Sequence, residues 1–235
     1  MKRYISLLIF AIFAFLLISC SDSQSSGNAT DTDSENNGDS IQTTAESEKK
    51  DNLPLTEEYL RSYKVAPASD FEYKLRADGY HITAYIGEDD VVVIPKEIDG
   101  TPVISIAKLV FANKSNVRGV LIPDTIKSLD STFGNNKSIE IVICEGVENM
   151  GPNVFNSCSN IKQIILGDSL TTIGECSFFS CKSLKEIYLA PTFVDISESI
   201  APAVFFGCKQ LTIVGEAGSY AETFAQEQGI NFRAK

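Results

Sequence analysis

The side chains that could carry out covalent or metal chemistry are six cysteines and one histidine. A thiol nucleophile needs a histidine base beside it, and only His81 exists. A zinc site needs closely spaced cysteine pairs with further ligands, and only Cys176 and Cys181 come near that spacing. We therefore expect no catalytic residue, no metal and no other cofactor, and we expect His81 to lie at the surface.

Three of the cysteines are better explained by a repeat. Cys158, Cys181 and Cys208 each stand three residues after a phenylalanine. Those phenylalanines belong to a column with spacings of 22, 22, 23 and 27 residues: Phe111, Phe133, Phe155, Phe178 and Phe205. A recurrent period of this length is typical of a solenoid, in which stacked copies bury side chains that one copy could not bury. We expect both columns to be structural ladders, with a disulfide between neighbouring coils as the alternative for the cysteines.

Five copies can be aligned on this period, and they occupy residues 91–116, 117–138, 139–160, 161–183 and 184–210. Each copy begins with a short apolar strand in which alternate residues, such as Ile164 and Leu166, face inward. After a turn, Leu170 and Ile173 point back toward the same core. The expected fold is a β-rich repeat solenoid with a parallel β ladder and short turns or helical segments.

The shared pattern is a strand, Ile-Pro, a turn, Ile-Gly and then Phe-x-x-Cys. It resembles the BspA-like leucine-rich repeat of bacterial surface proteins. The resemblance covers about Val91–Gly215, and its best copy runs from Leu170 to Leu184. The second copy departs from the pattern, because Asn136 stands where cysteine is expected. The resemblance implies a leucine-rich-repeat array, an adhesin-like or host-contact function, and no catalytic residues.

Segments on both sides of the array should cover its ends, which solenoids need. Residues 59–90 should form an N-terminal cap containing a hairpin, because Asp78-Gly79 separates two β-rich runs. The pattern Thr56-Glu57-Glu58 predicts a short helix before the hairpin, with Thr56 as N-cap. Residues 211–235 should form a C-terminal cap, with a helix that begins at a Ser219/Glu222 capping box and ends at Gly229.

The first 58 residues indicate export. Residues 1–19 have the basic start and apolar run of a signal peptide. Leu17-Ile18-Ser19-Cys20 resembles the bacterial lipoprotein box, which implies cleavage before Cys20 and a lipid anchor on its thiol. An ordinary secretory signal is the alternative. Residues 20–58 are acidic and almost free of large apolar residues, so they should form a disordered tether. We expect a chain anchored in the bacterial cell envelope and exposed at its surface.

The charge of the chain limits its partners. The formal net charge is −11, and removal of residues 1–19 makes it −13. This balance argues against nucleic acid and against electrostatic binding to anionic lipid, so membrane attachment must come from the anchor on Cys20. None of the P-loop, dinucleotide-binding, zinc-protease or serine-hydrolase motifs occurs in the mature chain. We therefore expect the protein not to be an enzyme.

A candidate binding face lies on the outward strand positions. The fifth position of the repeats is apolar and reads Leu121, Ile143, Ile165 and Tyr188, and polar residues flank this stripe: Lys162, Lys185, Gln163 and Glu186. Exposed apolar stripes usually mark interaction sites. The alternative is that the hairpin, an insertion in the fifth repeat around Ser197–Pro202, or another copy covers the stripe.

These observations together predict a non-catalytic, lipid-anchored surface protein that binds a protein or glycan partner and is monomeric. A structural or scaffolding lipoprotein that contacts a partner from the same cell is the alternative.

Overall fold

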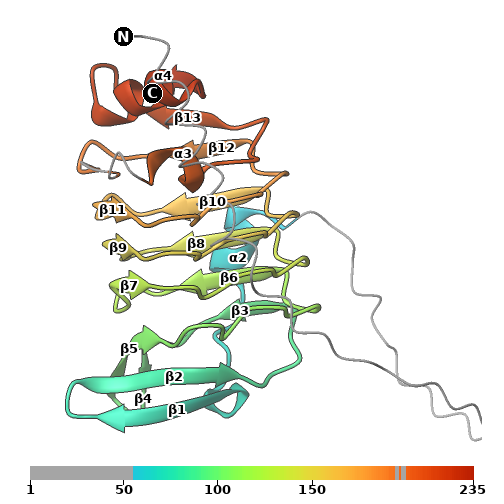
Figure 1. Cartoon of the computed structure of the whole chain (residues 1–235). Helices are drawn as coiled ribbons and strands as arrows, with labels where there is room; N and C mark the ends of the chain where they lie inside the picture. Colours follow the sequence, from blue (N-terminus) through green and yellow to red (C-terminus); the bar gives the residue numbers. More distant parts are fainter. Residues whose placement is uncertain (1–54, 194–195, 197–199) are drawn as a thin grey trace, which may run out of the picture.

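A parallel sheet of seven strands runs along the solenoid in the computed structural model, which describes residues 55–193, 196 and 200–235 (Figure 1). The signal peptide, Cys20 and nearly all of the expected tether lie outside the described residues. The strands, in spatial order, are β3 (Val91–Val93), β6 (Gly119–Ile122), β8 (Ile141–Cys144), β10 (Gln163–Leu166), β12 (Glu186–Tyr188), β13 (Thr212–Gly215) and β14 (Asn231–Ala234). The parallel solenoid expected from the repeat period is confirmed.

The inward strand positions supply the core. Val120 and Ile122 on β6 are fully buried, as are their equivalents on the neighbouring strands. Pro123 follows β6 directly and ends it, since proline cannot donate to the ladder. A second, three-stranded ladder of β7 (Ser128–Leu129), β9 (Asn149–Met150) and β11 (Thr172–Ile173) lies where the chain has turned back.

The phenylalanine column forms a continuous stack between these ladders. The ring centroids of Phe111, Phe133, Phe155, Phe178 and Phe205 follow one another at 5.2, 5.0, 5.6 and 5.0 Å. Tyr85 packs against one end of the stack in a tilted contact, and Phe224 meets the other end edge-on. The residue two positions after each phenylalanine has a positive φ, and asparagine, serine or glycine occupies it: Asn113, Asn135, Ser157, Ser180 and Gly207. Glycine and asparagine tolerate this left-handed conformation better than other residue types, whereas serine at the remaining two positions has no such preference.

The array is longer than the five repeats predicted. β13 pairs with β12 in the same parallel register, and β14 pairs with β13, although both strands lie in the segment expected to be a cap. The sequence signal was weak there because the repeat is interrupted after β13 by helix α4 (Tyr220–Gln228).

A four-stranded sheet lies beyond β3, at the end of the solenoid opposite α4 (Figure 1). Its order is β1 (Phe71–Arg76), β2 (Gly79–Tyr85), β5 (Thr101–Ile106) and β4 (Glu97–Ile98). β1 and β2 form the hairpin at Asp78-Gly79. A 3₁₀ turn, Ala68–Asp70, precedes the hairpin.

The short helix that Thr56 should begin is α2 (Glu57–Ser62), and the Thr56 hydroxyl accepts a hydrogen bond from Tyr59 N at 3.2 Å. The helix therefore begins inside the stretch expected to be tether.

The C-terminal helix differs from expectation at its start. The Ser219 hydroxyl is buried and caps nothing, while Glu222 Oε2 accepts from Gly218 N at 2.7 Å. The predicted capping box is wrong at Ser219, because the carboxylate reaches one residue further back. Gly229 ends the helix with φ 66°, and Phe224 packs on the last coil. A short helix, α3 (Ala201–Val204), lies between β12 and β13. That the hairpin and α4 act as caps stays a prediction.

Candidate binding face

Two columns of side chains face away from the core on the seven-stranded sheet, and together they form what we call the outer face. The first column contains Val91, Gly119, Ile141, Gln163, Glu186, Thr212 and Asn231. The second contains Val93, Leu121, Ile143, Ile165, Tyr188, Val214 and Arg233. Both columns are apolar on β3, β6 and β8, and the first becomes polar from β10 onward. The outer face thus has two chemically different halves.

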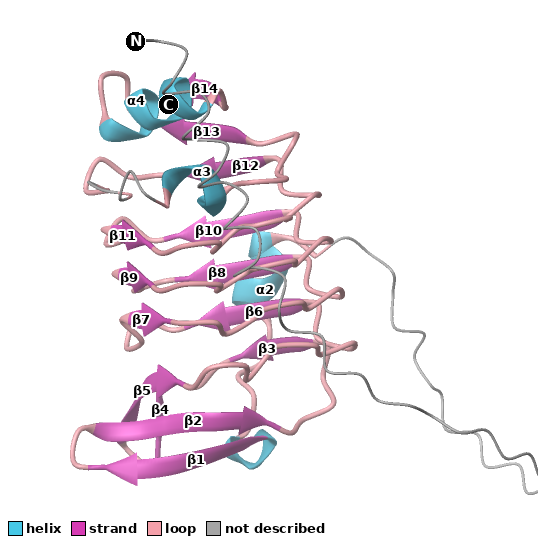
Figure 2. Cartoon of the chain, viewed as in Figure 1, coloured by secondary structure: helices cyan, strands magenta, loops and turns pink. Residues whose placement is uncertain are grey.

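Helix α2 covers the apolar half, which we call the covered half. Leu60 is fully buried against the outer residues of β3, β6 and β8, and Leu55 and Tyr63 pack at the edges of this second core. Gly119 provides the space for it, because a Cβ there would lie 3.1 Å from Leu55 Cδ1 and 3.6 Å from Leu60 Cδ1. Figure 2 shows α2 beside β6 and β8 rather than at an end of the solenoid.

This cover corrects the predicted binding stripe. Leu121 and Ile143 are buried and cannot face a partner while α2 is docked. The apolar stripe exists as predicted, but a helix of the same chain occupies its first half. The signal that could have shown this is that both outward columns are apolar at once on three consecutive strands.

Polar contacts hold α2 in addition to Leu60. Arg61 Nη1 donates to Glu145 Oε1 at 2.9 Å, and Arg61 Nε donates to Glu57 Oε1 at 2.8 Å. Just after the helix, Ala66 N donates to Val93 O at 2.9 Å. Solvent-exposed ion pairs of this kind contribute roughly 0–1 kcal/mol each, so the buried leucine dominates the contact.

The outer face on β10 and β12 is the open half, whereas Val214 on β13 is buried. Gln163 and Glu186 are exposed there, as are the neighbouring Lys162 and Lys185, while Ile165 and Tyr188 are half-buried. Lys235 Nζ lies 4.1 Å from the centroid of the Tyr188 ring, a cation–π contact. Six of the eight residues predicted for the binding face therefore remain accessible on this half or beside it.

A shallow groove of about 700 Å³ marks the border between the two halves. The groove combines an aliphatic wall with charged and amide groups: Leu55, Thr56, Glu57, Glu58, Arg61, Ser62 and Gln163. A few polar groups around an apolar wall can orient a bound side chain or sugar.

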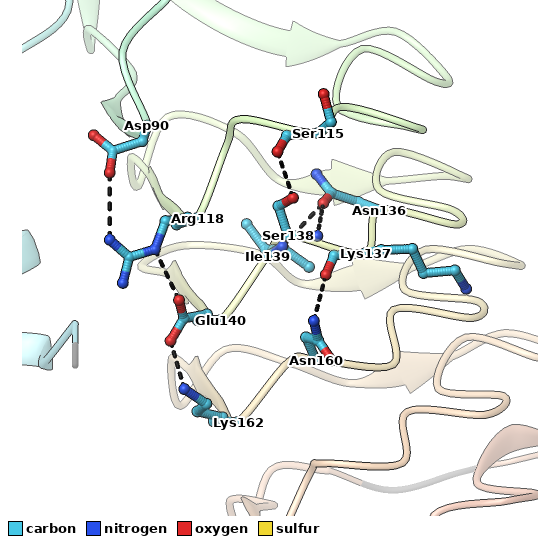
Figure 3. A network of polar contacts seen from close by, with 10 residues as sticks. All are labelled: Asp90, Ser115, Arg118, Asn136, Lys137, Ser138, Ile139, Glu140, Asn160 and Lys162. Atoms are coloured by element: carbon cyan, nitrogen blue, oxygen red, sulfur yellow. Dashed lines mark hydrogen bonds and ion pairs between the residues drawn. The ribbon is translucent and has the colours of Figure 1, made fainter. Parts of the chain in front are cut away.

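A row of ion pairs crosses the coils beside the outer face (Figure 3). Arg118 bridges Asp90 at 3.4 Å and Glu140 at 2.8 Å, and Glu140 also pairs with Lys162 at 2.6 Å. Burial alone would raise the pKa of Glu140, but hydrogen bonds from Lys162 and Arg118 hold that pKa below its ordinary value. Glu140 is thus a fixed anion that positions Lys162 at the rim of the open half.

The cysteine column has a specific structural role. The thiols of Cys158, Cys181 and Cys208 donate to the backbone oxygens of Phe133, Phe155 and Phe178, at 3.2, 3.2 and 3.0 Å. All three are free thiols, as is Cys144, so no disulfide joins the ladder residues. Burial raises the pKa of Cys158 to about 12. A thiol that stays protonated is a poor nucleophile and a poor metal ligand.

Asn136 takes the place of cysteine in the second copy and does more than fill it. Its Nδ2 donates to Phe111 O at 3.0 Å, the same contact that the thiols make. Its Oδ1 also accepts from Ser138 N and Ile139 N at 2.9 Å. The substitution therefore preserves the ladder.

His81 lies on the hairpin, away from the groove. Its Nδ1 is 2.6 Å from Ser105 Oγ and its Nε2 is 3.0 Å from Asp78 Oδ1. Neither partner was anticipated from the sequence.

Among the described residues, no group of three or more His, Cys, Asp or Glu side chains is placed to hold a metal ion. The described part of the chain also contains no helix with the length and apolarity needed to span a membrane.

The chain resembles known proteins over the repeat array. The model of the BspA type leucine-rich repeat region matches residues 94–215 in six copies, one more than the five repeats predicted from the sequence. No significant match was found among curated proteins.

Solved structures with a similar fold include a leucine-rich repeat protein of T. pallidum, 28% identical, with a TM-score of 0.59 over 64% of this chain and 71% of that one. A leucine-rich repeat protein of Bacteroides ovatus is 22% identical, with a TM-score of 0.48 over 65% and 47%. A leucine-rich cell surface protein of Faecalibacterium prausnitzii is 20% identical, with a TM-score of 0.36 over 66% and 55%.

The repeat model matches more than half of the 235 residues, and it covers the coils whose strands, phenylalanines and thiols form the ladders described above. The protein belongs to the BspA-type leucine-rich-repeat family.

Proposed function

We propose that the protein is an exported, lipid-anchored and non-catalytic bacterial surface protein that binds a protein or glycan partner through the open half of its outer face. Repeat solenoids bind through extended surfaces of this kind. The observation that carries the proposal is the contrast between the two halves. Where the outer face is fully apolar, the chain covers it itself, and where the face mixes Gln163, Ile165, Glu186 and Tyr188, it is left accessible.

The composition of the open half supports specific recognition rather than unspecific adhesion. Hydrogen-bonding side chains stand one coil apart in the first column, next to the aliphatic and aromatic side chains of the second. Arg233 pairs with Glu186 at 2.9 Å, which holds that carboxylate in place. Pre-positioned polar groups around a small apolar centre favour affinity and selectivity together.

Binding can be tested on bacterial cells that display the full chain. Fibronectin, laminin, type IV collagen and a mammalian glycan array serve as probes, and cells that lack the gene serve as the baseline. We expect retention of at least one probe to exceed that baseline tenfold. Equal retention of every probe by both kinds of cell would contradict the proposed function.

The anchor is tested separately with Cys20→Ser. Metabolic labelling with a radioactive fatty acid should mark the wild-type chain and not the variant, because the thiol is the proposed attachment point. Protease treatment of intact cells then tests surface display. Loss of the chain supports surface exposure, whereas protection of the folded chain favours the alternative, a scaffolding lipoprotein inside the envelope.

A further inference from the structure

Strand β1 is an unpaired edge of the four-stranded sheet. Among the described residues it pairs only with β2, and on its outer side only Phe71 N is engaged, donating to Ala68 O of the preceding 3₁₀ turn. Five consecutive residues, from Glu72 to Arg76, are exposed. A long exposed edge offers a row of free N–H and C=O groups to another strand. The register shift in the hairpin leaves Thr83 of β2 unpaired, so the extra residue lies on β2 and not on β1.

The sequence of this edge is self-complementary. Residues 70–76 read Asp-Phe-Glu-Tyr-Lys-Leu-Arg, with acids in the first half, bases in the second, and apolar residues between them. In an antiparallel pair centred on Tyr73, Glu72 lies opposite Lys74 of the second copy, and this pair occurs twice by symmetry. Asp70 belongs to the 3₁₀ turn before the strand and is not part of the pairing edge. Opposite charges at facing positions stabilise a sheet, whereas like charges destabilise it.

The described structure leaves these charges available. Glu72, Lys74 and Arg76 form no ion pair with any residue in the described ranges. Tyr73 and Leu75 are also exposed, on the opposite face of the strand from the charges, and Tyr73 is supported by an edge-on contact with Tyr80 at 4.9 Å. Charges on an edge strand normally prevent strand pairing. In this register Glu72 and Lys74 each meet the opposite charge, so these two charges select a second copy of this chain.

We propose that two copies of the protein pair along β1 in antiparallel register about Tyr73, which joins their four-stranded sheets into one. This replaces the monomer expected from the sequence. The paired strands are short, so the interface is of the small class typical of transient complexes, below about 1,200 Å². Attachment of both copies to one membrane would raise their effective concentration and favour the pair.

The register predicts which single cysteine can cross-link. Facing residues in an antiparallel pair have Cα atoms about 4.5–5.5 Å apart, within the range of a disulfide. Tyr73 faces Tyr73 of the second copy, so Tyr73→Cys should form an intermolecular disulfide. Leu75 lies four residues, roughly 13 Å along the strand, from Leu75 of the second copy, so Leu75→Cys should not form this disulfide. The full chain is expressed in a bacterial host, and membranes are oxidised with copper phenanthroline and analysed on non-reducing gels. The wild-type chain supplies the background from the native thiols.

We expect at least five times more disulfide-linked dimer from Tyr73→Cys than from Leu75→Cys. Adding Glu72→Lys to Tyr73→Cys should reduce the dimer at least fivefold, because like charges then face each other, and adding Lys74→Glu as well should restore it. Equal cross-linking at positions 73 and 75 would mean random collision and would overturn the proposal. An absence of dimer from Tyr73→Cys would also overturn the proposal, as would a dimer yield that neither charge substitution alters.

Discussion

Leu60 of α2 lies directly over Gly119 of β6, with its Cδ1 atom 3.6 Å from the point that a Cβ on the glycine would occupy. This contact joins the segment before the hairpin to the outer face of the repeat array. It sets where the outer face is closed and where it is open.

Leu60→Ala should destabilise the protein by about 2–4 kcal/mol, the usual cost for a fully buried leucine. Because Leu60 dominates the contact of a six-residue helix, hydrogen exchange should also accelerate in α2 and in strand β6, which the helix covers. Urea denaturation and hydrogen-exchange mass spectrometry measure the two effects. Glu58→Ala on the exposed side of the same helix is the control and should change stability by less than about 0.5 kcal/mol. Similar results for the two variants would show that Leu60 does not anchor α2.

Gly174→Ala should destabilise the array, because the added Cβ would lie 2.5 Å from the backbone carbon of Gly151 in the preceding coil. Overpacking of this kind costs roughly 1–3 kcal/mol, and backbone atoms cannot step aside as a side chain can. Gly134→Ala is the matched control, since the nearest atom to its Cβ is Asn153 O at 3.7 Å. Thermal unfolding of both variants is the measurement, and equal midpoints would contradict the close approach of the coils.

Asn136→Ala should cost about 2–3 kcal/mol, because Phe111 O loses its donor, and the buried N–H of Ile139 and the half-buried N–H of Ser138 lose their acceptor. Asn136→Cys should cost less, since a thiol can donate to the Phe111 oxygen as Cys158 does to Phe133. The order of the two urea midpoints is the decisive observation. A cysteine variant less stable than the alanine variant would mean that the ladder contact has no energetic role.

The buried thiols should make stability depend on alkaline pH. Burial raises the pKa of Cys144 to about 12, so the native thiol keeps its proton where the unfolded one loses it. This contribution is complete below the unfolded pKa of about 8.5 and declines as pH rises toward 12, by about 1.4 kcal/mol per pH unit. Urea denaturation between pH 8 and 10.5 should show a smaller decline for Cys144→Val than for the wild type. Parallel curves would indicate that this thiol is not buried as described.

The repeated parts of the fold could be predicted from the sequence, whereas the parts that occur only once could be predicted less completely. The phenylalanine column contains five residues and the cysteine column three, and the spacing of these residues is enough to predict the solenoid. Asn136 interrupts the cysteine column but makes the same contact, because its amide donates to a backbone oxygen as the thiols do. An alignment by residue type does not show this equivalence, since a hydrogen-bond donor is all that the two side chains have in common.

The covered half of the outer face was missed for a different reason. The pattern around Thr56 suggested a short helix, but nothing local in a six-residue segment says which surface it will cover. The information was present in Val91, Gly119 and Ile141, which are apolar or small where the later strands carry Gln163 and Glu186. A face that is apolar in both columns needs a cover, and Leu60 supplies it.

The central claim, that the open half of the outer face recognises the partner, is tested most directly by binding with paired variants. Cells displaying the full chain with Gln163→Ala and Tyr188→Ala are compared with cells carrying Lys127→Ala and Glu148→Ala, an exposed ion pair next to the second ladder. The probes are the matrix proteins and glycans named above, and display is matched by surface labelling. The account predicts at least a tenfold loss of probe retention for the first pair and wild-type retention for the second. Equal retention by both pairs would contradict it.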